Sequence, residues 1–269
     1  MKEIKEEICF SFLNKNEIEW LNKVYSIIQD EKSYGTFIMN FNLVSRKIES
    51  RILTENKDFI NFVSTHKDIG WEPIPNAQFF ARYALIYKLK EWGAEEYIET
   101  VKRMLLTLEH REAEHFYRML PFLPHNNRFV EQAEEILRTN STDIFIAFSQ
   151  NSPWPKENFD EKAWNRMILK SIFLNCSLLN VVGLQEKNNE ELYESLLQYA
   201  KERKAAKRVI PHDLWVLLFP LLKENEINFI TDYFKSCERD EKEIIIKALA
   251  KYGQNTVNSS VVSSRFALE

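Results

Sequence analysis

The chain has 269 residues, of which 45% are hydrophobic and 13% aromatic, enough to bury a substantial core in one large domain or two small ones. Lys and Arg total 36 and Asp and Glu total 40, so the net charge is -4 and provides no overall field that would attract nucleic acid or an anionic membrane surface. We therefore expect no nucleic acid among the partners.

The beginning of the chain lacks the pattern of a secretory signal. The segment MKEIKEEICFSFL carries acidic residues where a signal peptide needs a basic segment followed by an apolar one. Apolar stretches such as WVLLFPLL are too short to cross a bilayer. Three widely spaced cysteines, Cys9, Cys176 and Cys237, favour reduced thiols over disulfides. The sequence predicts a soluble, cytoplasmic protein with no direct membrane insertion.

Helical spacing dominates the apolar pattern, and strand-like alternation is rare. A clear example is the set Tyr97, Val101, Met104, Leu105 and Leu108, which repeats at the spacing of one helix face. We expect about ten to twelve helices joined by short turns, and hence an all-α fold. Short connections make neighbouring helices antiparallel, which favours an irregular α-α superhelix of stacked helix pairs, similar to HEAT and armadillo repeats. A compact multi-helix bundle is the alternative.

Composition suggests three parts of the chain. Residues 1–70 are rich in charge and end at HKDIGWEPIPNAQ, and we expect them to form an N-terminal helical subdomain. Residues 71–253 form the main helical domain, in which Asn188 and Asp240, each followed three residues later by Glu, are expected to cap helices. Residues 254–269 are polar without helical spacing, which predicts a flexible tail.

The segment EHREAEH, residues 109–115, does not have the spacing of a zinc site. His110 and His115 are five residues apart, whereas a spacing of four places two imidazoles on one helix face. We interpret Glu109 and Glu114 as surface residues. The chain also shows no phosphate-binding loop and no nucleophile with its base. The sequence therefore predicts neither a metal nor another cofactor.

The segment NSPWPKENFDEKAWNRMILKS, residues 151–171, is the first candidate for a site. Prolines fix their own φ and disfavour helical geometry in the residue before them, so Ser152 and Trp154 should be extended and rigid. Asp160 is expected to cap the helix that follows. We expect the rigid segment to form one wall of a concave pocket whose floor carries Asn165, with Trp154 meeting a flat or apolar partner. The alternative is that the segment is only a corner of the fold.

On the helix after Asp160, polar side chains lie among apolar ones. Trp164 belongs to an apolar face, and Arg166 and Lys170 share a narrow polar arc. Asn165 lies on an apolar face, where an amide without a partner costs about 1–3 kcal/mol. We therefore expect Asn165 to bind either protein backbone or a ligand.

The basic run KERKAAKR, residues 201–208, places Lys201, Lys204 and Arg208 on one helix face. Such a face can receive a phosphate or a carboxylate. Basic residues near a helix C-terminus are also favoured by the helix dipole and are commonly solvated there. Both interpretations stay open.

Two long segments carry a resemblance to a known family. The runs LRTNSTDIFIAFSQNSPWPKENFDEKAWNRMILKSIF and VVGLQEKNNEELYESLLQYAKERKAAKRVIPHDLW resemble the conserved C-terminal half of the bacterial EboA-domain family, over roughly residues 77–222. The matching positions are Arg138, Thr139, Asn140, residues 153–155, Phe159, Trp164, Asn165, Lys170, Phe173, Gly183, Leu184, Glu202, Arg203, Ala205, Ala206, Arg208 and Trp215.

The chain departs from the family pattern at two places. Ser152 and Trp154 stand where the family usually has Asn-Pro-Tyr-Pro, and Arg166 replaces the glutamine that usually follows the Trp-Asn pair. A ligand that a tyrosine hydroxyl holds in the family would be held differently here.

The resemblance implies a biological context rather than a reaction. Members of the family occur in gene clusters with a membrane prenyltransferase-like protein, a metal-dependent hydrolase-like protein, a cyclase resembling dehydroquinate synthase and sugar-isomerase-like barrels. The cluster is linked to making or exporting a small secreted metabolite. The expected partners are therefore other proteins of that cluster, including the prenyltransferase-like protein, and a small-molecule intermediate. The resemblance assigns no catalytic residues.

Two functions follow as alternatives. The first is a non-catalytic helical scaffold or substrate-holding protein, which the lack of catalytic groupings favours. The second is an enzyme acting on a small anionic or prenylated intermediate in an apolar helical pocket, although a paired-aspartate helix for magnesium diphosphate is absent. The candidate ligand-binding residues are Asn140, Trp154, Trp164, Asn165, Arg166, Lys170, Arg203 and Arg208. The polar groups of Asn140, Asn165 and Lys170 would otherwise cap neighbouring helix ends inside a superhelix.

Overall fold

The computed structural model describes residues 3–65 and 75–252. Within these residues there are fifteen α-helices and eight short 3-10 helices, and the β-type pairing is limited to an isolated antiparallel bridge between Ile52 and Asn76. The predicted all-α class is confirmed.

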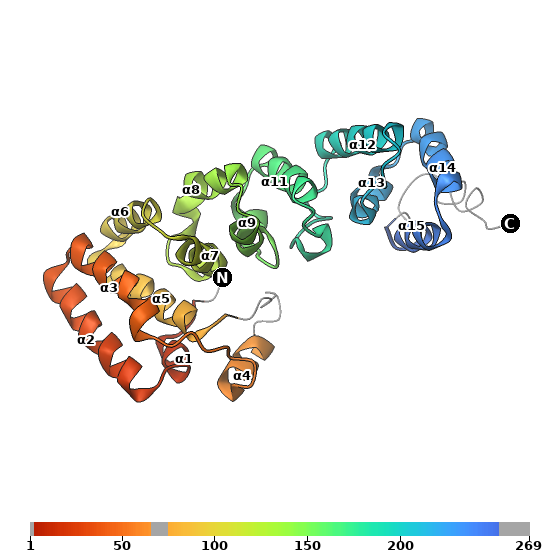
Figure 1. Ribbon diagram of the computed structural model, residues 1–269. Helices are drawn as coiled ribbons and strands as arrows, with labels where there is room; N and C mark the ends of the chain where they lie inside the picture. The colour runs from red at the N-terminus through yellow and green to blue at the C-terminus, as the bar shows by residue number, and fades with distance from the viewer. Residues whose placement is uncertain (1–2, 66–74, 253–269) are drawn as a thin grey trace. The chain divides into compact units, whose positions relative to one another are not determined.

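Contacts along the chain divide it into two compact units, Met1–Phe159 and Asp160–Glu269. The first unit contains α1 (Glu6–Ser11), α2 (Lys15–Glu31), α3 (Tyr34–Lys47), α4 (Lys57–Thr65), α5 (Ala77–Lys88), α6 (Ala94–Leu105), α7 (His110–Met119), α8 (Val130–Glu135), α9 (Thr142–Ser149) and α10 (Trp154–Asn158), as Figure 1 shows. The second contains α11 (Glu161–Phe173), α12 (Glu190–Ala205), α13 (Trp215–Leu218), α14 (Ile227–Ser236) and α15 (Arg239–Tyr252). The 3-10 helices are η1 (Leu89–Trp92), η2 (Leu120–Phe122), η3 (Asn126–Phe129), η4 (Ile136–Arg138), η5 (Leu178–Asn180), η6 (His212–Leu214), η7 (Phe219–Leu221) and η8 (Glu224–Glu226).

The division at Phe159 differs from the boundary at residue 70 that the composition suggests. Residue 70 and the expected tail, residues 254–269, lie outside the described residues. The subdomain at 1–70, the domain at 71–253 and the flexible tail therefore stay predictions. The choice between a superhelix and a bundle also stays a prediction.

In the first unit α5 is the central helix. Every residue from Ala77 to Ile86 is buried, and the helix packs against α1, α2, α3 and α7 (Figure 1). A helix that is buried on all sides has to be covered by neighbours on all sides. Tyr83 of α5 accepts a hydrogen bond from the backbone N–H of Ile4 at 3.0 Å and donates one to the carbonyl of Phe122 at 3.1 Å. The helix thereby joins the beginning of the chain to η2.

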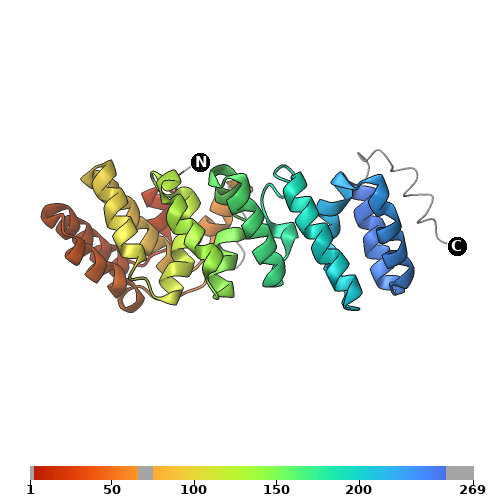
Figure 2. The same cartoon turned by 90° about the horizontal axis from the view of Figure 1, so that it is seen from above.

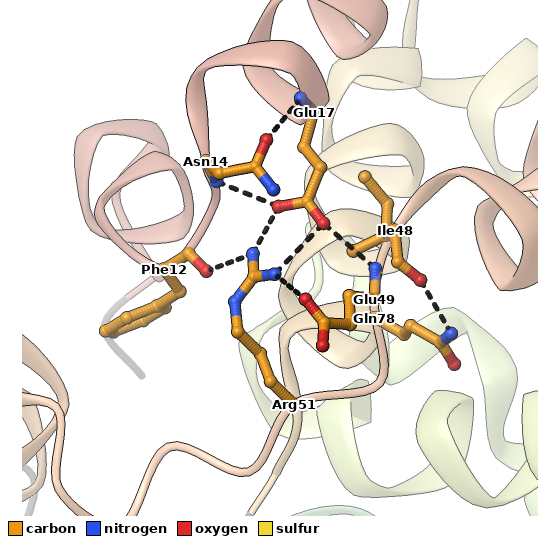
Figure 3. Close-up of polar contacts among 7 residues, drawn as sticks. All are labelled: Phe12, Asn14, Glu17, Ile48, Glu49, Arg51 and Gln78. Atoms are coloured by element: carbon orange, nitrogen blue, oxygen red, sulfur yellow. Dashed lines mark hydrogen bonds and ion pairs between the residues drawn. The ribbon is translucent and has the colours of Figure 1, made fainter.

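A charged cluster in the first unit ties the start of α2 to the segment after α3 (Figure 3). The carboxylate of Glu17 accepts hydrogen bonds from the backbone N–H groups of Asn14 at 2.8 Å and Glu49 at 2.9 Å. Arg51 binds both oxygens of this carboxylate and also donates to the carbonyl of Phe12 at 3.1 Å. Burial alone would raise the pKa of Glu17, but the bonds from Arg51, Glu49 and Asn14 together hold it below its ordinary value.

The second unit has its own core around α13. All four residues of α13 are buried, and the helix packs against α12 and α15. The helices α11 and α12 also pack against each other, and they are drawn in green and teal in Figure 2. The ring of Trp215 stacks on that of Phe219, with centroids 5.5 Å apart. Such aromatic pairs add about 0.5–1.5 kcal/mol to the burial of their surface.

The helix caps agree with the sequence in part. Asp160 caps α11 as predicted, since its side chain accepts from the N–H of Ala163 at 2.7 Å. The expected cap at Asn188 is wrong by one residue: Asn189 caps α12, because the amide of Asn188 is used on the carbonyl of Leu217 at 2.8 Å. Asp240 lies inside the first turn of α15, which begins one residue earlier.

Candidate functional site

The predicted pocket wall around Trp154 is part of the core of the first unit. Trp154 is 0% exposed. Its ring packs against those of Phe148 and Phe159, with centroids 5.8 and 5.6 Å away. Its indole Nε1–H donates to the carbonyl of Asn126 at 3.2 Å. Protein groups therefore surround the ring and use its single polar atom.

The expectation that Trp154 is extended is wrong, because Trp154 is the first residue of α10. Pro153 has helical backbone angles, with φ -77° and ψ -11°. Pro155 stands in the first turn, where a helix needs no N–H from its residues. The side chain of Asn158 donates to the carbonyl of Trp154 at 2.9 Å. Packing and these bonds override the preference of a pre-proline residue for extended geometry.

The partner of Asn165 is a side chain of the second unit. Asn165 and Asn189 exchange two amide hydrogen bonds, of 3.2 and 2.9 Å. The oxygen of Asn189 also accepts from the N–H of Leu192 at 2.9 Å, which caps α12. Asn165 thus holds the side chain that begins the next helix, and both ends of its amide are bonded to protein.

The other predicted residues of this region are dispersed. Trp164 is fully buried, and the ammonium group of Lys187 lies 5.3 Å from its ring centroid. On α11 Arg166 is exposed, and Lys170 is half-buried, so that burial lowers the pKa of Lys170. Asn140 is exposed between η4 and α9. The prediction that these residues bind a ligand stays a prediction.

The basic run forms the C-terminal end of α12. The N–H of Lys207 donates to the carbonyl of Lys204 at 3.0 Å, and that of Arg208 donates to the carbonyl of Arg203 at 2.9 Å. These two bonds, with Lys207 in the left-handed region at φ 55°, make a Schellman turn. Arg203 closes the turn from outside, because its Nε–H donates to the carbonyl of Val209 at 2.6 Å.

This turn places three cations around a pocket of the second unit. Lys204, Lys207 and Arg208 line a pocket of about 340 Å³ together with Val209, Tyr233, Ser236, Cys237 and Glu241. Tyr233 and Cys237 are buried, whereas Lys207 and Arg208 are exposed. We call it the α12 pocket. It brings together two of the three cations that the sequence placed on one face, Lys204 and Arg208.

The charges around the α12 pocket are not balanced. The third predicted cation, Lys201, forms an ion pair with Glu226 at 3.1 Å and does not line the pocket. Neither Lys207 nor Arg208 forms an ion pair with another described residue. The carboxylate that lines the pocket, Glu241, accepts a hydrogen bond from the hydroxyl of Tyr233. Three cations therefore face one carboxylate that is already hydrogen-bonded.

Two buried residues that line the α12 pocket, Cys237 and Tyr233, are held in their protonated forms. Burial, followed by the charge of Glu241, raises the pKa of the Cys237 thiol to about 12. Burial also raises the pKa of Tyr233, followed by its hydrogen bond to Glu241. Cys237 donates to the carbonyl of Tyr233 at 3.2 Å. At neutral pH these groups are hydrogen-bond donors, and the thiol is not a nucleophile.

Another pocket of the second unit contains residues of catalytic type, but the hydrogen bonds of its carboxylate are structural. Cys176, His212 and Asp213 contribute to a pocket of about 400 Å³. One oxygen of Asp213 accepts from the hydroxyl of Ser177 and the N–H of Leu178, both at 2.8 Å, and so fixes the start of η5. Among the described side chains, no group of three or more His, Cys, Asp and Glu is arranged to hold a metal ion.

Comparison with known proteins identifies the family. The sequence model of the family described as "Metabolite traffic protein EboA" matches residues 2–219. The chain belongs to the EboA family. The name of the family indicates a role in metabolite traffic. No curated protein and no solved structure matches the chain.

The EboA match divides the α12 pocket. Its three cations lie within the matched residues, whereas Tyr233, Cys237 and Glu241 lie beyond residue 219. The sequence missed Lys207, whose place at the pocket depends on the left-handed turn after α12. In the part of the chain that the structure describes, no helix has both the length and the apolar surface needed to span a lipid bilayer.

Proposed function

We propose that this EboA-family chain is a non-catalytic substrate-holding protein that binds a small anionic metabolite in the α12 pocket. The observation that carries the proposal is the pair Lys207 and Arg208, which line the pocket beside Lys204 and have no ion-pair partner among the described residues. A phosphate or carboxylate group would supply the missing negative charge through charge-assisted hydrogen bonds.

The chemistry of the α12 pocket supports holding rather than turnover. A nucleophile needs a lowered pKa or an adjacent base, whereas burial raises the pKa of Cys237 and of Tyr233. Both groups donate hydrogen bonds to protein oxygens. An enzyme acting on a small anionic intermediate is the alternative, and it would need a catalytic group from elsewhere.

We further propose that the protein works in the cytoplasm with other proteins of its gene cluster, in a pathway that makes or exports a small secreted metabolite. A holding protein of this kind would pass an intermediate between partners. Partners among the cluster, including the membrane prenyltransferase-like protein, would be recovered with the chain in a pull-down from cells that express the whole cluster.

The test compares metabolite profiles of a deletion strain complemented with different variants. The double variant Lys207→Ala/Arg208→Ala should fold normally, because both side chains are exposed, and it should lose the metabolite without accumulating a precursor. Lys162→Ala removes an exposed cation of α11 outside the pocket and is the matched control. One accumulated precursor would favour the enzyme alternative. Normal output from the double variant would refute the role of the pocket.

A further inference from the structure

A second basic pocket lies in the first unit, along one face of α7. Arg111, Glu114, His115 and Arg118 follow one another at the spacing of a single helix face. They line a pocket of about 200 Å³, whose other side is formed by Ser50 and residues of the segment 75–79. We call it the α7 pocket. All of its lining residues belong to the first unit, so it is separate from the α12 pocket.

The buried Arg82 determines which ring nitrogen of His115 carries the proton. Arg82 of α5 is 1% exposed, and its Nη1 lies 3.0 Å from Nδ1 of His115. A guanidinium group has only donors, so Nδ1 must be the acceptor of this bond. The neutral imidazole therefore carries its proton on Nε2. Arg82 thus fixes the tautomer and leaves Nε2–H as the remaining donor of a ring that lines the pocket.

Burial and the surrounding positive charges keep the imidazole of His115 neutral. Burial, followed by the positive charges of Arg82, Arg118 and Arg111, lowers the pKa of His115 to about 3. At neutral pH the ring is therefore a hydrogen-bond donor of fixed tautomer rather than a cation. The residue is 6% exposed, and its ring packs edge-on against Phe79, which limits rotation of the ring.

The charges of this region leave a positive excess at the pocket. Arg82 is paired with Glu112 at 3.4 Å, and Arg118 is paired with Glu114, also at 3.4 Å. Arg111 is exposed and forms no ion pair with another described residue. Among the described residues, Glu112 and Glu114 thus already have guanidinium partners, whereas Arg111 has no carboxylate partner.

Neutral donors on the opposite wall point to the same kind of ligand. The amide of Asn76 donates to the hydroxyl of Ser50 at 3.0 Å, so the hydroxyl still has its own proton to donate. The lining thus contributes an imidazole N–H, a hydroxyl and a guanidinium that has no ion-pair partner among the described residues, while its carboxylate, Glu114, is already paired with Arg118. Its volume suits a small anion or the charged end of a larger molecule.

We infer that the α7 pocket binds an oxyanion group, either a phosphate or a carboxylate, through the Nε2–H of His115 and the guanidinium of Arg111. Bidentate binding by an arginine and one directed N–H bond would orient the group, as in other oxyanion sites. The site is independent of the proposed function, because none of its residues lines the α12 pocket.

The experiment uses the full chain carrying Lys207→Ala and Arg208→Ala, so that the α12 pocket cannot contribute. The protein is titrated with inorganic phosphate and, in a second arm, with citrate, while NMR follows the ring nitrogens of its histidines. The spectrum of His115→Gln assigns the signals of His115. We expect a saturable shift of the Nε2 signal of His115 with at least one of the two anions.

Two arginine variants decide the role of Arg111. Arg111→Gln removes an exposed charge and should weaken the binding about tenfold or more, as expected for the loss of a charge-assisted bond. Arg46→Gln removes an exposed arginine of α3 outside the pocket and should leave the affinity unchanged. Unchanged Nε2 signals at millimolar concentrations of both anions would overturn the inference, and so would equal affinity in Arg111→Gln. Neither result would affect the proposed role of the α12 pocket.

Discussion

The substitution Trp154→Ala tests whether the segment 151–160 is a structural part of the first unit. The indole ring is fully buried between the rings of Phe148 and Phe159, and its N–H is bonded to the carbonyl of Asn126. Alanine would leave a cavity, remove both ring contacts and leave that carbonyl without its donor.

The expected loss of stability follows from these contacts. Replacing a buried Trp by Ala costs about 3–5 kcal/mol in transfer and cavity energy, which already includes part of the ring contacts. The lost hydrogen bond adds about 1 kcal/mol. We therefore expect a loss of about 4–6 kcal/mol, a large fraction of the 5–15 kcal/mol that is typical of a folded domain. Trp154→Phe keeps an aromatic ring in place and should cost about 1–2 kcal/mol, for the lost hydrogen bond and a smaller cavity.

Urea unfolding followed by far-UV circular dichroism measures the two losses, and hydrogen exchange shows which unit is destabilised. The ring contacts of Trp154 with Phe148 and Phe159 and its hydrogen bond to Asn126 lie in the first unit, so protection should fall in α9 and α10 and stay unchanged in α12. Metabolite output in cells should fall only in proportion to the loss of folded protein.

Two results would refute this reasoning. A loss below about 1 kcal/mol in Trp154→Ala would show that the ring contributes little to the core. Abolished output from Trp154→Phe that remains folded would show that the indole has a role beyond packing, as the sequence-based prediction of a binding site requires.

Three further substitutions test single features. Glu17→Gln should lower the free energy of unfolding at pH 7 by about 2–4 kcal/mol, because it leaves Arg51 without its buried carboxylate. The pKa of Glu17 is lower in the folded state, so the stability that its carboxylate contributes should be present above the ordinary pKa of 4.5 and lost as the pH falls through the folded pKa. The stabilities of the wild type and the variant should therefore converge in acid unfolding experiments. Asn165→Ala should cost about 1–3 kcal/mol in urea unfolding, because the amide of Asn189 loses its partner; an unchanged midpoint would exclude that role. Lys207→Gly should raise the melting temperature, because glycine adopts the left-handed geometry at φ 55° without the roughly 1 kcal/mol of strain that lysine has there. A lower melting temperature would contradict the assignment of a Schellman turn.

The fold class could be predicted because it depends on local patterns. Tyr97, Val101 and Met104 follow helical spacing, and they form the buried face of α6. Asp160 caps α11 because a cap needs only an N–H three residues ahead. The sequence could not show whether Asn188 or Asn189 caps α12. That choice depends on the distant residue Leu217, whose carbonyl accepts a hydrogen bond from the amide of Asn188.

The candidate sites could be predicted only in part, because they depend on contacts between distant residues. Arg208 and Lys204 were visible as a basic face, but Tyr233 and Glu241 reach the same pocket from α14 and α15. The α7 pocket was not visible, because spacing made His115 an unsuitable zinc ligand and gave no sign of Arg82, 33 residues away, as its neighbour.

The central position of α5 has a consequence for protein synthesis. The hydrogen bond between Ile4 and Tyr83 joins residues 79 positions apart, and α1 packs against α5. Because translation proceeds from the N-terminus, α1 leaves the ribosome long before its main partner and must wait with its apolar face exposed. We expect ribosome-bound chains that end before α5 to be sensitive to protease and to bind chaperones. In chains that are long enough for α7 to emerge from the exit tunnel, the helices α1 to α5 should become resistant to protease at the same chain length.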